Sequence, residues 1–91
     1  MTEPEDRIAA LRARFLARAT DDLAMLRNAD DETAQYIAHR LAGSAGTFGF
    51  TSISQAAILL DEALDRSVEA AEIKRLRAAL VSALAKAIQT S

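Results

Sequence analysis

The stretch Ala38-His39-Arg40-Leu41-Ala42-Gly43-Ser44-Ala45-Gly46-Thr47-Phe48-Gly49-Phe50 contains the only histidine of the chain and all three of its glycines. At 100° per residue, Ile37, Leu41 and Ala45 fall on one side of a helix, and Ser44 and Phe48 lie close to them. His39 lies about 160–200° from Ile37 and Leu41 on the same wheel, on the opposite side. The spacing predicts an amphipathic helix that faces a core and carries an exposed imidazole.

Two glycines share the side of the helix on which His39 lies. Gly43 and Gly46 fall within about 40° of His39, and each interior glycine costs roughly 1 kcal/mol relative to alanine. No feature of the apolar face requires them. We therefore expect a helix surface without side chains beside His39, which leaves room for a large partner to approach the ring.

The composition favours a single all-helical domain over residues 1–91. Hydrophobic residues make up 51% of the chain, but aromatic residues only 4%, so the core must consist mainly of Ala, Leu and Ile. One proline and three glycines supply little turn chemistry for a β protein. The net charge of −2 argues against nucleic acid and anionic membranes as partners.

Several functional classes are excluded by what the sequence lacks. Without cysteine there can be no disulfide, thiol nucleophile or Cys-based zinc site. No apolar run approaches the ~20 residues that span a bilayer, and the acidic start is not a secretory signal. We therefore expect a cytoplasmic protein, and Met1 with a capped first helix favours a free-standing one.

Apolar stripes and capping signals predict four helices. The first begins at Thr2 as N-cap, with Pro4 in the first turn and Glu5 reaching back, and runs to about Arg27. The second runs from about Asp31 to Phe48, capped by Asp30 or Asp31 and ended by Gly49 in the left-handed conformation. Ser52 and Gln55 form a capping box that starts the third helix. A turn at residues 65–67 precedes the fourth, which begins near Glu69 and Glu72 and ends near Gln89.

Each predicted helix has an apolar stripe that must be buried. In chain order, the stripes outside the second helix are Ile8, Leu11, Phe15, Ala19, Leu23 and Leu26; Ile53, Ala57, Leu60 and Leu64; and Ile73, Leu76, Leu80, Leu84 and Ala87 or Ile88. Asp21 and Asp22 could interrupt the first helix, because Asp prefers caps to interiors. Short links favour an antiparallel up-down-up-down four-helix bundle.

The pattern formed by His39, Leu41, Gly43 and Gly49 resembles the phosphohistidine motif of histidine-containing phosphotransfer (HPt) domains, and the family's size and helical build fit the whole chain. The resemblance implies that His39 accepts a phosphoryl group from one receiver-domain aspartate and passes it to another. It implies a phosphocarrier rather than an enzyme, with response-regulator receivers and a hybrid histidine kinase as partners. No cofactor of its own is expected, and Mg²⁺ would come from the receiver. We expect a monomer.

One position departs from the family pattern, which has lysine three residues after the histidine where this chain has Ala42. The nearest cation is Arg40, about 100° round the helix. Arg40 could reach the phosphoryl group, contact the receiver or simply be solvated.

Other residues are candidates for the site around His39. Gln35 lies on the face of His39 and could hydrogen-bond the ring or the phosphoryl group, whereas Glu32 more plausibly caps the helix or meets the partner. Tyr36 and Phe50 flank the histidine helix, and an apolar patch beside a reactive group is typical of a docking surface. Off the third stripe, Leu59 is favoured for docking and Ile58 for the core.

Three other functions compete with the phosphocarrier. A histidine kinase dimerisation domain would have an acidic residue after the histidine and a proline shortly downstream, whereas Arg40 follows here and Pro4 is the only proline. An HPt-like module that binds receivers without taking phosphate stays open because of Ala42. A nucleic-acid binder is disfavoured by the charge, and no metal site is expected.

Overall fold

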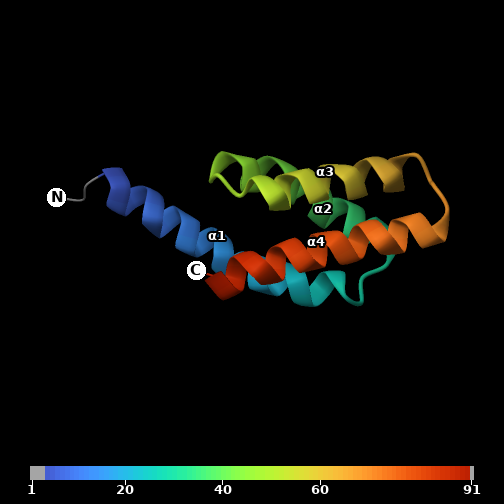
Figure 1. Cartoon of the computed structure of the whole chain (residues 1–91), viewed down its shortest axis with the longest axis horizontal. Helices are drawn as coiled ribbons and strands as arrows, with labels where there is room; N and C mark the ends of the chain where they lie inside the picture. Colours follow the sequence, from blue (N-terminus) through green and yellow to red (C-terminus); the bar gives the residue numbers. More distant parts are fainter. Residues whose placement is uncertain (1–3, 91) are drawn as a thin grey trace.

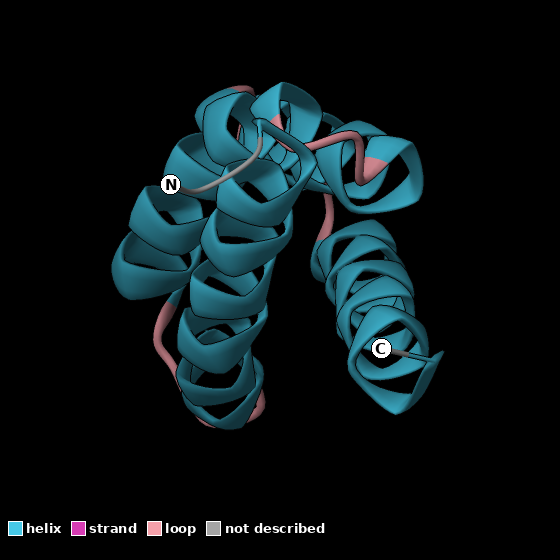
Figure 2. Cartoon of the chain, turned by 90° about the vertical axis from the view of Figure 1, so that its left-hand side faces the viewer, coloured by secondary structure: helices cyan, strands magenta, loops and turns pink. Residues whose placement is uncertain are grey.

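The computed structural model describes residues 4–90, which form four helices and no strand. The helices are α1 (Pro4–Leu26), α2 (Asp31–Thr47), α3 (Thr51–Asp65) and α4 (Ala70–Thr90). The expected all-helical class is confirmed, and Figure 2 shows loops only where one helix gives way to the next. The predicted N-cap, Thr2, lies outside the described residues. None of the four helices is both long and apolar enough to span a membrane.

The helices surround one core, in which α1 contacts α2 and α4, and α3 contacts the same two helices. In Figure 1 the ribbon runs along the long axis in one direction in α1 and α3 and returns in α2 and α4. The predicted stripes of the second, third and fourth helices supply most of the buried side chains. The largest fully buried ones are Leu26, Ile37, Leu41, Ile53, Leu60, Leu80 and Leu84.

The stripe of α1 is buried only in its second half. Phe15, Ala19 and Leu26 are buried as predicted, but Ile8 is 55% and Leu11 37% exposed. Burial at these two positions was therefore wrongly predicted. The first turns of α1 project beyond the other helices (Figure 1), so the apolar spacing continues past the end of the core.

The α1–α2 connection is closed by an N-cap and by a distant arginine. The Thr33 amide donates to Asp30 Oδ1 at 2.8 Å, so the predicted cap is present, and this bond lowers the pKa of the Asp30 carboxyl. From α4, Arg77 Nη1 donates to the carbonyls of Leu26 and Ala29, and its Nη2 donates to Asp31. Arg77 thus satisfies the Leu26 carbonyl, which α1 leaves unpaired at its end, and the Ala29 carbonyl in the loop that follows.

The α2–α3 turn is tighter than the sequence predicted. Gly49 adopts φ 83°, as expected, while the Phe50 amide donates to the Ala45 carbonyl at 2.8 Å and Gly49 to Gly46 at 3.2 Å. These two bonds form a Schellman motif. The Phe50 carbonyl already accepts the Ser54 amide, so α3 begins at Thr51. The predicted Ser52 capping box is therefore wrong, because Ser52 lies inside the first turn and no side chain caps α3.

Candidate functional site

His39 lies in the middle of α2 with its side chain 81% exposed. Ile37 and Leu41, on the opposite side of the helix, are buried in the core. The helical periodicity of the apolar residues therefore orients the imidazole toward solvent. The exposure expected for the ring is present in the structure.

Asp61 on α3 binds the imidazole of His39. The His39 Nδ1 and Asp61 Oδ2 atoms are 2.9 Å apart, and the Asp61 side chain is 23% exposed. An ionised carboxylate can only accept hydrogen bonds, so the proton of the neutral ring lies on Nδ1. The lone pair on Nε2 is then free to act as a nucleophile, and Asp61 can stabilise positive charge that develops on the ring.

Gln35 contacts Asp61 rather than the imidazole. Its Nε2 donates to Asp61 Oδ1 at 3.2 Å, while the other carboxylate oxygen accepts from His39. Both oxygens of Asp61 are therefore hydrogen-bonded to α2. The sequence predicted that Gln35 shares the face of His39 and could hydrogen-bond the imidazole. In the structure, Gln35 instead hydrogen-bonds Asp61, the carboxylate that contacts the imidazole.

The two glycines beside His39 have different surroundings. A Cβ atom on Gly43 would meet nothing within 4 Å, so this glycine leaves open surface next to the ring. A Cβ on Gly46 would lie 3.4 Å from Ser54 Oγ on α3. Ser54 Oγ donates to the Ala42 carbonyl at 2.7 Å, so the helices approach closely here. Both glycines are exposed, as we expected, but only Gly43 has open space on every side, because a Cβ on Gly46 would come into ordinary van der Waals contact with Ser54.

The two positions considered for a cation supply none to the ring. Ala42 is half-buried and packs against the core. Arg40 points toward α1, where its guanidinium pairs with the buried carboxylate of Asp22. Its side chain is 23% exposed, so it is not the solvated arginine considered above. His39 and Arg40 are thus held by different neighbouring helices.

Apolar side chains around His39 form a smaller patch than the sequence suggested. Tyr36 is 65% exposed and lies one turn before His39. On α3, Ile58 is 41% exposed and lies one turn before Asp61, on the same side of the helix. Leu59 is also exposed, at 53%, but its position is about 160° from Asp61 on the helical wheel. Ile58 is therefore closer to the imidazole side of α3 than Leu59.

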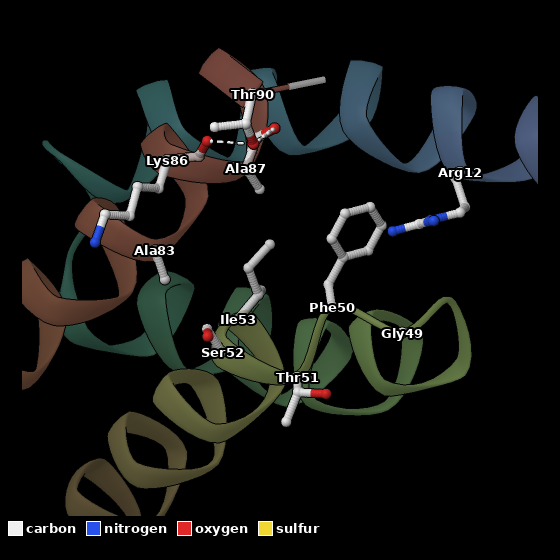
Figure 3. A pocket seen from close by; sticks show the side chains of 10 residues that line it. All are labelled: Arg12, Gly49, Phe50, Thr51, Ser52, Ile53, Ala83, Lys86, Ala87 and Thr90. Carbon is white, nitrogen blue, oxygen red and sulfur yellow. Dashed lines mark hydrogen bonds between the residues drawn. The ribbon is translucent and has the colours of Figure 1, made fainter.

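Phe50 belongs to a different part of the molecule. Its ring stacks on Phe15 with centroids 4.9 Å apart, and the Arg12 guanidinium carbon lies 4.7 Å from its centroid. Figure 3 shows Phe50 and Ile53 pointing into a pocket of about 440 Å³ between the start of α3 and the end of α4. Neither His39 nor Asp61 lines that pocket. Phe50 therefore packs α1 onto the α2–α3 turn.

Within residues 4–90, no cluster of three or more His, Asp or Glu side chains could hold a metal ion. The neighbouring acid Glu32, two turns before His39, is exposed in the first turn of α2.

Sequence reasoning missed two aspartates, Asp61 and Asp22. Both lie inside helices, where aspartate is a poor helix former. Each sits beside buried residues of its own stripe, Leu60 for Asp61 and Ala19 for Asp22. An aspartate at the edge of an apolar stripe is the sequence signal that could have predicted a hydrogen bond or ion pair with a side chain on a neighbouring helix.

A family model for the Hpt domain matches residues 10–90 of the chain. The match includes α1 from residue 10 onward, all of α2, α3 and α4, and both His39 and Asp61. No curated protein and no solved structure gives a significant match.

Proposed function

The chain belongs to the Hpt domain family, and from the geometry around His39 we propose that its imidazole relays a phosphoryl group between receiver-domain aspartates. Histidine phosphotransfer in phosphorelays is the activity of this family, and its members are phosphocarrier modules. The observation that carries the proposal is the 2.9 Å contact between His39 Nδ1 and Asp61 Oδ2. It leaves Nε2 unprotonated on an exposed surface.

The transfer step uses Nε2 as the nucleophile. Nε2 attacks the phosphorus of a receiver acyl phosphate, a P–N bond forms, and the P–O bond to the aspartate breaks, so that the carboxylate leaves. The Nδ1 proton stays on the ring, which becomes positively charged, and Asp61 accepts its hydrogen bond throughout. Transfer to the next receiver reverses these bond changes. The Mg²⁺ that neutralises the moving charge belongs to the receiver.

The partner surface includes Tyr36, Gly43 and Ile58. Gly43 leaves space for close approach, and the two exposed apolar side chains flank the ring on α2 and α3. Gln35 positions Asp61. Short loops and the alternating direction of the ribbon in Figure 1 support the antiparallel up-down-up-down bundle on which this surface rests.

The test is phosphoryl transfer from ³²P-labelled receiver domains with Mg²⁺. The wild-type chain should gain phosphate that survives alkali but not acid, and His39→Gln should gain none. Asp61→Asn keeps a hydrogen-bond acceptor but loses the charge, and we expect it to react about tenfold more slowly, equivalent to about 1.4 kcal/mol in the barrier. Glu62→Gln is the matched control, because Glu62 is exposed and follows Asp61 directly.

Two results would overturn the proposal. If His39→Gln still becomes labelled, the acceptor is another residue. If the wild-type chain binds receivers but never becomes labelled, it is an interaction module, which the lack of a cation at Ala42 favours.

A further inference from the structure

A groove of about 400 Å³ runs between α1 and α2, on a different side of α2 from the His39–Asp61 contact. Three arginines line it, Arg14 and Arg18 from α1 and Arg40 from α2. Leu11, Phe15 and Phe48 supply its apolar wall. The phosphoryl chemistry of His39 uses none of these residues.

The positive charge of this groove comes from Arg14 and Arg18. They lie four residues apart, so both guanidiniums project from the same side of α1, about 6 Å apart along its axis. Both are exposed, and neither forms an ion pair with any residue of the described part of the chain. Arg40, by contrast, is neutralised by Asp22. Two like charges on adjacent turns repel each other, so the pair Arg14 and Arg18 does not by itself stabilise α1.

The apolar part of the groove is partly open to solvent. Leu11, in the first half of α1, is 37% exposed. Phe48 is half-buried, and its ring centroid lies 5.9 Å from that of Phe15. A bound segment could cover Leu11 and Phe48 while its acidic groups pair with the two arginines.

We propose that this groove binds an acidic segment of a partner protein, in which two carboxylates flank one apolar side chain. Each guanidinium can hold a carboxylate through two parallel hydrogen bonds. The apolar wall distinguishes this partner from nucleic acid, which would require a longer basic track than two uncompensated arginines on a chain of net charge −2. The proposal goes beyond the relay function, because binding here needs neither His39 nor phosphate.

The experiment measures binding of a fluorescein-labelled peptide that alternates glutamate with leucine to the full chain at low salt. The wild-type chain should bind it, and a peptide with glutamine at every glutamate should bind at least tenfold more weakly. The double variant Arg14→Glu/Arg18→Glu should lose at least tenfold in affinity, and so should the milder Arg14→Gln/Arg18→Gln.

The matched control is Arg7→Glu/Arg27→Glu, which makes the same change in net charge. Arg7 and Arg27 are exposed arginines in or just after α1, and neither lines the groove. This control should lose less than threefold. In backbone NMR spectra, the amides of Leu11, Ser44 and Phe48 should shift on binding, and that of Asp61 should not.

Three outcomes overturn the proposal: no binding of the acidic peptide, equal losses in the two charge-reversal variants, or equally tight binding of a single-stranded oligonucleotide. Phosphorylation of His39 in the same variants is a separate readout. Loss of peptide binding with normal phosphorylation leaves the relay function intact, and failed phosphorylation with normal peptide binding leaves the groove intact.

Discussion

At the scale of single residues, His39 contacts one acceptor, Asp61, and neither Arg40 nor position 42 offers it a cation. Asp61 binds its ring, and Arg40 is turned toward Asp22 on α1. Phosphorylation of Nε2 adds at least one negative charge that only the partner can neutralise. We therefore expect phospho-His39 to pass its phosphoryl group on readily.

Ala42→Lys should raise the amount of phosphate held on His39. Position 42 lies one turn after His39, so a lysine there could reach the phosphoryl oxygens. A charge-assisted contact of about 1.5 kcal/mol would shift the transfer equilibrium toward His39 by roughly tenfold. The measurement is the fraction of label on the chain at equilibrium with a receiver. Ala42→Gln, which has similar bulk without charge, should leave this fraction close to wild type. An unchanged fraction in Ala42→Lys would show that the receiver alone neutralises the phosphoryl group.

Gly43→Leu should preserve stability and block transfer. Its Cβ meets nothing, and leucine is a better helix former by up to about 1 kcal/mol, so urea unfolding should show equal or higher stability. The added side chain occupies the approach to His39, and the transfer rate should fall at least tenfold.

Gly46→Leu provides the contrasting control. The leucine side chain would extend from a Cβ that already contacts Ser54 on α3, so it should destabilise the fold by about 1–3 kcal/mol.

If Gly43→Leu transfers phosphate at the wild-type rate, the receiver must approach His39 from another side.

The exposed position of His39 and the bare surface at Gly43 could be predicted from the sequence, because both depend only on the periodicity of one helix. The partners of His39 could not. The Asp61 contact depends on the register between α2 and α3, and a single helical pattern carries no information about that register. The same limit explains why Ser54, the α3 neighbour of the exposed Gly46, could not be predicted from the sequence.

At the scale of the helices, the Asp22–Arg40 pair ties α1 to α2. Asp22 Oδ2 and Arg40 Nε are buried without a hydrogen-bond partner among the described residues, so the pair is incompletely satisfied. The cost of desolvating both ions can offset their attraction, but removing only one leaves an uncompensated charge.

Asp22→Leu should therefore destabilise the protein by about 3 kcal/mol in urea unfolding, whereas Asp22→Leu/Arg40→Met should restore most of that loss. The double variant also tests Arg40 as a phosphate ligand without the complication of instability. Because Arg40 faces α1, we expect the double variant to accept phosphate within threefold of the wild-type rate. A tenfold slower rate in a stably folded double variant would assign Arg40 to the transfer step after all.

The lengths and order of the helices follow from local signals, as at Asp30 and Gly49, but the start of α3 does not. Ser52 and Gln55 satisfy the spacing of a capping box. The Phe50 ring stacks on Phe15 of α1, and the α2–α3 turn therefore ends at Phe50. Tertiary packing thus determines where α3 begins. The hydrogen bonds of Arg77 could not be predicted from local signals either, because the carbonyls that accept them lie 48 and 51 residues away in sequence.

At the scale of the whole molecule, the first turns of α1 extend beyond the core. Residues 5–10 are all exposed, so the apolar spacing there continues beyond the core. Periodicity predicts which side of a helix is apolar, but it cannot show where the neighbouring helices end.

Deletion of residues 2–10 should change the free energy of unfolding by about 1 kcal/mol or less, because every residue from 5 to 10 is exposed. Leu26→Ala, at a fully buried position of the same helix, should cost about 2–5 kcal/mol. Both values can be obtained from urea melts. A loss above 2 kcal/mol on deletion would mean that these turns stabilise the core from outside it.

The Cα extents of 51 × 20 × 18 Å make the molecule a rod, and His39 lies near the middle of the helix that runs along its flank. Such a rod tumbles anisotropically, so rotation about the long axis is fast and end-over-end rotation is slow. A globular partner docked on the flank widens the short dimensions and slows mainly the fast rotation. The backbone N–H bonds in these helices lie nearly along the long axis, so their NMR relaxation depends chiefly on the slow end-over-end rotation. Methyl groups that point across the rod should therefore reveal docking more sensitively than backbone amides.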